Sequence, residues 1–283
     1  MADIFNQMLS RYNIKTTDDR QNAVHEVMQQ ICLAGLNRAG FFDKAAFYGG
    51  TCLRIFYRLN RFSEDMDFSL TEIDDKFNLE NYFDAITNEF TLLGRNVLIE
   101  KKEKSQESQI ESAFLKDTTD IVNVRFQTEP SLKIKIEVDK VPPLKFNTEH
   151  KLLLLPFSFM TRCFTLPGLF AGKVHALMFR KWRNRVKGRD WYDFEWFVRN
   201  NVPLDFTHFK ERAIQSEGID FENLTPGQFK QLLKEKINST KIEMVIADVH
   251  RFVINPQELD IWSTNYFLQI TDMIRIESQQ SFA

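Results

Sequence analysis

Two aspartates separated by a single residue, Asp65 and Asp67, are the side chains of this sequence best suited to chemistry. They stand at the start of an apolar stretch expected to be a strand, in which residues two apart point to the same face. Like charges at that distance repel unless a cation lies between them. Mg²⁺ takes carboxylate oxygens and shares its remaining positions with water and phosphates. The pair therefore predicts a magnesium site.

A third carboxylate is expected from the stretch SLKIKIEVD, residues 131–139, which alternates strictly between apolar and charged residues. Such alternation predicts a strand with one buried face. Glu137 lies on the charged face and would complete a two-metal site if this strand lies beside the aspartates. Asp139 is on the same face and is the alternative third acid.

A glycine pair, Gly49 and Gly50, follows an apolar run and precedes Thr51 and a helical pattern. Glycine has no Cβ, so its backbone N–H groups can approach a phosphate closely, and a helix N-terminus attracts anions. The turn therefore predicts a triphosphate site. With the metals it would activate an attacking oxygen and stabilise a leaving pyrophosphate.

A second group of charged residues lies further along the chain. Lys173 and Arg180 are seven residues apart, hence on nearly the same face of a helix, where two cations could bind a triphosphate or a nucleic-acid backbone. Asp190 and Asp193 are one turn apart on the next helix, and Asp190 could orient Lys173. The alternatives are that Asp190 only stabilises the first turn of its helix and that Lys173 is an ordinary surface lysine.

The stretch RKWRNRVKGR, residues 180–189, concentrates positive charge in a chain whose net charge is −2. Its basic residues are Arg180, Lys181, Arg183, Arg185, Lys187 and Arg189. Such a run is compatible with a solvated connection or with RNA binding, with Trp182 stacking on a base. The five histidines show no paired-ligand spacing, so His175 is expected to be a packed or exposed helix residue.

Periodicity predicts the elements that position these residues. Helices are expected at 21–40, 51–59 and 79–94, and strands at 44–48, 66–70, 96–101, 120–129 and 131–139. Beyond the prolines at 142, 143 and 156 the pattern becomes almost wholly helical. The prediction is an α/β (α+β) protein: a mixed sheet flanked by helices in a core domain, 1–160, followed by a helical domain, 161–283.

Composition narrows the class of protein. At 283 residues and 43% hydrophobic content the chain can bury a sizeable core, and its net charge gives no global basic field. Three distant cysteines argue against zinc or disulfides and fit small buried side chains in a reducing compartment. The N-terminus has no secretory pattern and the longest apolar run, 152–160, is broken by proline. A cytoplasmic protein without a membrane partner is expected.

The stretch from Gly49 to Leu70 resembles the first motif of the nucleotidyltransferase superfamily, specifically of AbiEii-type toxins from abortive-infection and toxin–antitoxin systems. The matching residues are Gly49, Gly50, Thr51, Leu53, Arg61, Ser63, Asp65, Asp67 and Phe68. The superfamily more often has Gly-Ser and a shorter gap, so the second glycine and the longer helix favour the toxin branch. A second signature matches Lys173, Ala176, Arg180, Arg189, Asp190 and Asp193. The similarity covers most of residues 45–200.

The resemblance implies an Mg²⁺-dependent nucleotidyltransferase that moves a nucleotide from an NTP to an acceptor such as a tRNA 3′ end. It also implies a cognate antitoxin. Asp65 and Asp67, with Glu137, would hold the metals. The phosphates would be bound by Gly49, Gly50, Thr51 and Ser63, and the nucleotide site would be completed by Lys173, Arg180 and Asp190. The catalytic residues would then be Asp65, Asp67, Lys173 and Asp190.

Three other functions fit parts of the pattern. A small-molecule nucleotidyltransferase would keep the fold and change the acceptor, although the basic run argues mildly against it. A nuclease could use the same acids, but the lysine after Glu137 is Lys140, which does not give the common E-x-K spacing. A binding module without turnover would have no physical reason to keep three mutually repelling acids.

Overall fold

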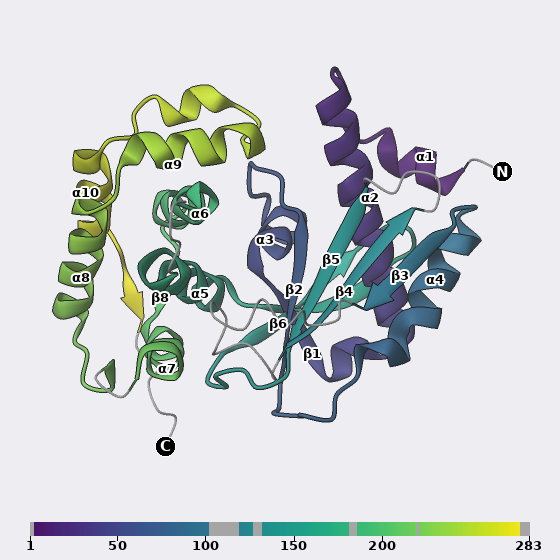
Figure 1. Cartoon of the computed structure of the whole chain (residues 1–283), viewed down its shortest axis with the longest axis horizontal. Helices are drawn as coiled ribbons and strands as arrows, with labels where there is room; N and C mark the ends of the chain where they lie inside the picture. The colour runs from purple at the N-terminus through teal and green to yellow at the C-terminus, as the bar shows by residue number, and fades with distance from the viewer. Residues whose placement is uncertain (1–2, 102–118, 127–131, 181–185, 219–220, 278–283) are drawn as a thin grey trace. The chain divides into compact units, whose positions relative to one another are not determined.

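The computed structural model describes residues 3–101, 119–126, 132–180, 186–218 and 221–277. The chain forms two compact units (Figure 1). The sheet unit comprises Met1–Arg58, Phe62–Pro142 and Thr148–Cys163. The helical unit comprises Leu59–Arg61, Pro143–Asn147 and Phe164–Ala283.

A seven-stranded mixed sheet forms the centre of the sheet unit, in the order β3-β4-β5-β2-β1-β7-β6. The strands are β1 (Ala45–Tyr48), β2 (Asp65–Leu70), β3 (Val97–Lys101), β4 (Thr119–Phe126), β5 (Lys133–Asp139), β6 (Thr148–Leu153) and β7 (Phe159–Phe164). Strand β2 pairs in parallel with β5 and antiparallel with β1, which places it among the central strands. Strand β1 also pairs in parallel with β7.

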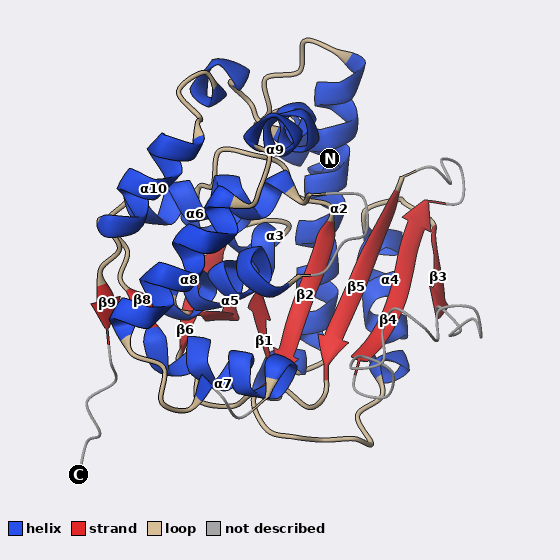
Figure 2. Ribbon diagram, turned by 60° about the vertical axis from the view of Figure 1, so that its left-hand side comes forward, coloured by secondary structure: helices blue, strands red, loops and turns tan. Residues whose placement is uncertain are grey.

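The apolar side chains of the central strands are buried on one face of this sheet. Met66, Phe68, Ile134, Ile136 and Val138 are almost fully buried there. Helices α2 (Thr17–Arg38) and α4 (Phe83–Leu92) pack against each other, and they contact β5 and β3 respectively (Figure 2). The charged residues of β2 and β5 therefore occupy the opposite face, because side chains alternate along a strand.

Helix α1 (Ile4–Leu9) precedes α2, and α3 (Gly49–Tyr57) follows β1 directly. The short helices η1 (Phe41–Asp43) and η2 (Leu79–Tyr82) connect the longer elements. A capping box between Thr16 and Asp19 starts α2. All three cysteines are free and buried, as the sequence predicted.

The strands and helices predicted up to residue 139 are confirmed, within a few residues at their ends. Strands β6 and β7 were not predicted, because the sequence beyond the prolines was expected to be almost wholly helical. Only one position of β1, Phe47, is paired with β7, opposite Cys163. Strand β6 has no fully buried residue, so its sequence lacks the apolar alternation that indicates a strand.

The helical unit contains α5 (Leu166–Phe179), α6 (Gly188–Arg199), α7 (Phe206–Glu217), α8 (Pro226–Asn238), α9 (Ile242–Val249) and α10 (Thr264–Asp272). Short helices η5 (His250–Phe252) and η6 (Pro256–Leu259) join α9 to α10, and β8 (Leu204–Asp205) pairs in parallel with β9 (Ile276–Glu277). The predicted mixed α/β fold is confirmed. No helix within the described ranges is long and apolar enough to cross a membrane.

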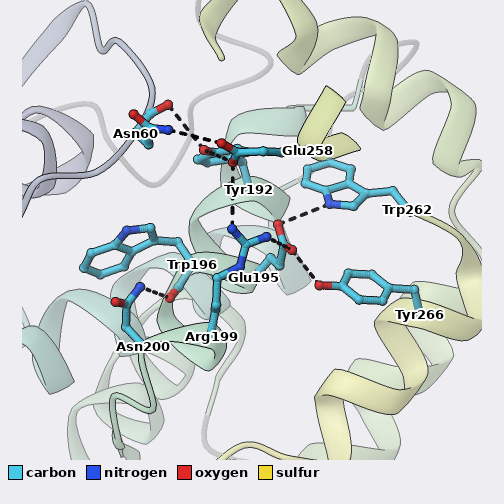
Figure 3. A network of polar contacts seen from close by, with 9 residues as sticks. All are labelled: Asn60, Tyr192, Glu195, Trp196, Arg199, Asn200, Glu258, Trp262 and Tyr266. Atoms are coloured by element: carbon cyan, nitrogen blue, oxygen red, sulfur yellow. Dashed lines mark hydrogen bonds and ion pairs between the residues drawn. The ribbon is translucent and has the colours of Figure 1, made fainter. Parts of the chain in front are cut away.

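A buried carboxylate joins α6 to the C-terminal part of the helical unit (Figure 3). Glu195 accepts hydrogen bonds from Trp262 Nε1, 3.2 Å away, and from the Tyr266 hydroxyl, and it pairs with Arg199. The Tyr192 hydroxyl lies 3.1 Å from Oε2 of Glu258. A buried charge is stable only when paired in this way, so the network anchors α6.

Candidate active site

The pairing register of the sheet brings the predicted acids together. Asp67 lies directly opposite Glu137 on the neighbouring parallel strand, and Asp65 lies opposite Lys135. All four side chains share the face that α2 and α4 leave uncovered. Asp139 is opposite Ser69 instead, one step further from the aspartate pair. The register therefore favours Glu137 over Asp139 as the acid beside Asp67.

The glycine turn lies on the other side of Asp67, because Tyr48 at the end of β1 is the partner of Asp67. Gly49 has a φ of +83°, which L side chains rarely adopt. A Cβ at this position would lie 2.2 Å from Oδ2 of Asp67. The glycine is thus needed both for the backbone conformation and for the close approach of the Asp67 carboxylate to the N-terminus of α3.

Two buried polar side chains hold the segment that leads into Asp65. Thr51 is fully buried and its hydroxyl donates to the backbone carbonyl of Asp65. The amide of Gln29 donates to the carbonyls of Ser63 and Glu64, at 2.9 and 3.1 Å. The Thr51 hydroxyl predicted to bind phosphate is therefore used to fix the strand, and Gln29 is a supporting residue that the sequence did not reveal.

A lysine lies among the acids. Lys135 Nζ is 2.7 Å from Oε1 of Glu137. Burial alone would lower the pKa of Lys135, but the hydrogen bond and charge of Glu137, with the charges of Asp65 and Asp67, raise it above its ordinary value. The carboxylates therefore already attract a cation to this face of the sheet.

These acids fit a divalent metal ion, because their oxygens are the ligands that Mg²⁺ prefers and they attract positive charge. In the described part of the chain, however, no three His, Cys, Asp or Glu side chains are close enough to form a ready-made metal cluster. Glu137 would exchange Lys135 for the ion.

Four residues of the second signature form a charge cluster inside the helical unit with Arg61 of the first motif. The cluster consists of Arg61, Lys173, Arg180, Asp190 and Asp193. Arg61 makes two hydrogen bonds to Asp193, of 2.7 and 2.6 Å, with both side chains almost fully buried. Lys173 Nζ lies 2.7 Å from Asp193 Oδ2 and 3.6 Å from Asp190 Oδ1. Lys173 is therefore oriented by both aspartates, and the shorter contact is to Asp193.

The electrostatics of this cluster follow from its burial. Burial alone would raise the pKa of Asp193, but the charges and hydrogen bonds of Arg61 and Lys173 hold it below its ordinary value. Arg180 pairs with Asp190 at 2.9 Å. Three cations thus surround two carboxylates in this cluster.

A pocket of about 620 Å³ in the helical unit has Arg180, Lys187 and Asp190 in its lining. Burial lowers the pKa of Lys187 to about 8, although Asp190 acts in the opposite direction. Arg189 is buried and its guanidinium lies 4.2 Å from the centre of the Phe252 ring. Lys181, Trp182, Arg183 and Arg185 of the predicted RNA-binding run lie outside the described residues.

Sequence reasoning missed the roles of Arg61 and Asp193, which it matched to the motifs without assigning them a function. The two motifs carried the signal, since the first has an arginine before the aspartate pair and the second has another aspartate after Asp190. What the sequence could not show is that these two residues, 132 positions apart, form one buried pair.

Comparison with known proteins places these features in a family. The family described as nucleotidyl transferase AbiEii toxin of type IV toxin–antitoxin systems matches residues 31–266. The chain belongs to this family and is a nucleotidyltransferase, as the sequence predicted. No curated protein is similar enough to count as a relative.

Solved structures are similar to this chain at low sequence identity, and the first of them shares its fold. JHP933 from Helicobacter pylori is 18% identical, with 89% of this chain and 90% of that chain covered and a TM-score of 0.50. A putative nucleotidyltransferase from H. pylori is 19% identical, with coverages of 88% and 91% and a TM-score of 0.48. MenT4, a nucleotidyltransferase toxin from Mycobacterium tuberculosis, is 19% identical, with coverages of 88% and 74% and a TM-score of 0.47.

Proposed function

We propose that this nucleotidyltransferase transfers a nucleotide from an NTP to an RNA acceptor such as a tRNA 3′ end. It would act as a toxin that a cognate antitoxin neutralises, in keeping with its family. The observation that carries the proposal is the register of the sheet, which sets Asp67 between Glu137 on one side and the glycine turn on the other. This is the arrangement needed to bring carboxylates and a phosphate-binding turn together.

Mg²⁺ held by Asp65, Asp67 and Glu137 would neutralise the phosphates and polarise the reacting oxygens. The backbone at Gly49 and Gly50 would bind the triphosphate, since no Cβ blocks the approach and the start of α3 carries partial positive charge. Gln29 and Thr51 keep the entry to β2 in place through their hydrogen bonds to backbone carbonyls. Ser63 is assigned to phosphate binding together with Gly49 and Gly50. Its backbone carbonyl is held by Gln29.

Lys173 is assigned to the nucleotide because it is the ammonium group of the charge cluster and two carboxylates orient it. A lysine held in this way can meet a phosphate as a point charge without a further loss of side-chain freedom. Asp190 positions Lys173 and also binds Arg180. Arg180 adds a second cation for the phosphates.

The test is to incubate the purified protein with Mg²⁺, each of the four radiolabelled NTPs in turn, and total bacterial tRNA. Asp65→Asn and Asp67→Asn keep the shape of the side chains and remove the charge, so labelling should fall by more than about 100-fold. Glu137→Gln should do the same, whereas Asp139→Asn, beside Ser69, should leave the rate close to that of the unchanged protein. Labelling that survives in both aspartate variants would contradict the assignment.

A small-molecule acceptor is the second candidate, because the acids and the glycine turn would act on the NTP in the same way with either acceptor. The same reaction distinguishes the two candidates, because label would then appear on small molecules and not on tRNA. Degradation of tRNA without NTP would instead indicate a nuclease.

A further inference from the structure

A pocket of about 540 Å³ lies in the sheet unit next to Asp65. It is formed by residues of α2, the segment 62–64, the start of β2, β4, and the residues at and just before the start of β5. Its lining residues are Gln21, Asn22, His25, Phe62, Ser63, Glu64, Asp65, Asn123, Leu132, Lys133 and Lys135. The family signatures explain only Ser63 and Asp65 of this set.

The position of the pocket relative to the acids follows from strand order. Strand β1 and its glycine turn flank β2 on one side, and β5 and then β4 flank it on the other. Asp65 is opposite Lys135, which in turn is opposite Asn123. The pocket therefore lies on the β5 side of the aspartates, whereas the glycine turn lies on the β1 side.

In an in-line phosphoryl or nucleotidyl transfer, the attacking oxygen and the leaving group are on opposite sides of the phosphorus. If the triphosphate lies at the glycine turn, its leaving pyrophosphate is on the β1 side, and the attacking hydroxyl must come from the β5 side. We propose that this pocket binds the 3′-terminal nucleoside of a single-stranded RNA acceptor. The inference rests on the proposed function and deepens it.

The chemistry of the lining suits a nucleobase. Phe62 is half-buried and presents a ring whose position is supported by the Arg54 guanidinium, 4.8 Å from the ring centre. Bases stack on such rings without regard to sequence. The amides of Asn22 and Asn123 can donate and accept, as the edges of a base require.

His25 also lines the pocket, and a hydrogen bond fixes the orientation of its ring. Its Nε2 donates to the carbonyl oxygen of Lys133 at 2.8 Å, because a carbonyl can only accept. Burial lowers the pKa of His25 below its ordinary value, so the ring is neutral at neutral pH and its Nδ1 is an acceptor.

Two lysines of the lining would make the pocket prefer an RNA end to an isolated nucleoside. Lys133 is exposed and Lys135 half-buried, and both point from β5 to the pocket side. They supply positive charge for the phosphate that precedes the terminal nucleoside. The 3′ hydroxyl oxygen then forms the new bond to the α-phosphorus of the NTP, the bond to the β-phosphate oxygen breaks, pyrophosphate leaves, and the hydroxyl proton is released to water.

The first test measures binding and does not depend on turnover. A short single-stranded RNA with a photoreactive thiouridine at its 3′ end is crosslinked to the full protein, and a matched RNA carries the same group at its 5′ end. We expect the 3′ label to attach to peptides containing residues 21–25 or Phe62, and the 5′ label to attach elsewhere. Equal labelling by both RNAs, or 3′ labelling only outside the pocket, overturns the proposal.

The second test separates acceptor from donor. Phe62→Leu should raise KM for tRNA by roughly tenfold, the effect expected for loss of one stacked base, and leave KM for the NTP unchanged. Phe157→Leu is the matched control, since Phe157 is also a half-buried ring of the sheet unit with a guanidinium above it, that of Arg38 at 4.0 Å. Lys133→Gln gives a second variant at an exposed position, where loss of folding is not expected.

The outcomes also separate this inference from the proposed function. If the variants raise KM for the NTP and not KM for tRNA, the pocket binds the donor. If both KM values are unchanged in both variants, the pocket binds neither substrate. Either result overturns the inference. Transfer to small molecules only would likewise overturn it and leave nucleotidyl transfer established. If the protein labels no acceptor at all, the proposed function fails, and the crosslinking result still decides whether the pocket binds an RNA end.

Discussion

At the scale of single residues, the tightest steric constraint in the candidate site is the close approach of the Asp67 carboxylate to Gly49. A positive φ and a carboxylate lying where a Cβ would be both require glycine at this position. The two requirements have different consequences, because backbone strain affects stability and the displacement of Asp67 affects the chemistry.

Gly49→Ala therefore tests the site directly. The added methyl group should displace the Asp67 carboxylate and reduce nucleotidyl transfer by roughly 100-fold. Gly94→Ala is the control, because Gly94 also has a positive φ, +69°, but nothing lies within 4 Å of its added Cβ. Each variant should lose about 1–2 kcal/mol of unfolding free energy from backbone strain, and only the first should lose activity. Equal activity of the two variants in the tRNA labelling reaction would contradict the role of Asp67.

At the scale of elements, the position of α6 depends on the ion pairs that its aspartates make. Asp190 and Asp193 are one turn apart and so face the same side of the helix. Asp193 is fully buried and accepts from Arg61, which comes from the short segment Leu59–Arg61. That segment is also bound to the helical unit by a backbone bridge between Arg61 and Val253.

Removal of both partners of the buried pair should cost less than the two single removals added together. Arg61→Met leaves the Asp193 carboxylate with less compensation and should cost about 3–5 kcal/mol of unfolding free energy. Arg61→Met combined with Asp193→Leu should cost less than the sum of the two single changes, since neither the guanidinium nor the carboxylate is then left buried without the other. Denaturant unfolding of the four proteins measures the coupling, and simple additivity would show that the pair is energetically unimportant.

At the scale of the whole molecule, the two units are not consecutive in sequence. Leu59–Arg61 and Pro143–Asn147 belong to the helical unit, although both lie within the predicted core domain, 1–160. A cut at residue 160 would therefore leave Asp193 on a fragment without Arg61. We expect neither fragment to retain the charge cluster.

The unfolding free energy of the whole chain should also depend on pH. Burial lowers the pKa of His208 to about 3, with the charge of Arg212 acting in the same direction, and burial likewise lowers that of His175 to about 3. In the unfolded chain both have a pKa of about 6.5. The unfolded state thus binds more protons below that pH, so stability is complete above pH ~6.5 and decreases as the pH falls towards 3, by up to about 1.4 kcal/mol per pH unit for each histidine.

His208→Leu should make the unfolding free energy less dependent on pH between about 6.5 and 4. Its ring lies 5.8 Å from those of Phe146 and Phe164, so an apolar replacement suits the surroundings. His250→Leu is the control, because its side chain is exposed and should leave the dependence unchanged. Thermal or denaturant unfolding across this pH range gives the slopes, and identical slopes for the wild type and His208→Leu would contradict the interpretation.

The sequence by itself determined the local geometry of the site. Alternation along 131–139 separated the buried face from the charged face, and the spacing of Asp65 and Asp67 placed both carboxylates on one side. The glycine pair marked the start of α3. Each of these features depends on backbone periodicity over a few residues, which is encoded locally.

Only the tertiary structure decided which distant residues meet. Strand pairing set Glu137, and not Asp139, beside Asp67, and it brought Lys135 among the acids. The Arg61–Asp193 pair and strands β6 and β7 also emerged only in the folded chain. Register and burial depend on contacts between segments far apart in sequence, so no local pattern could specify them.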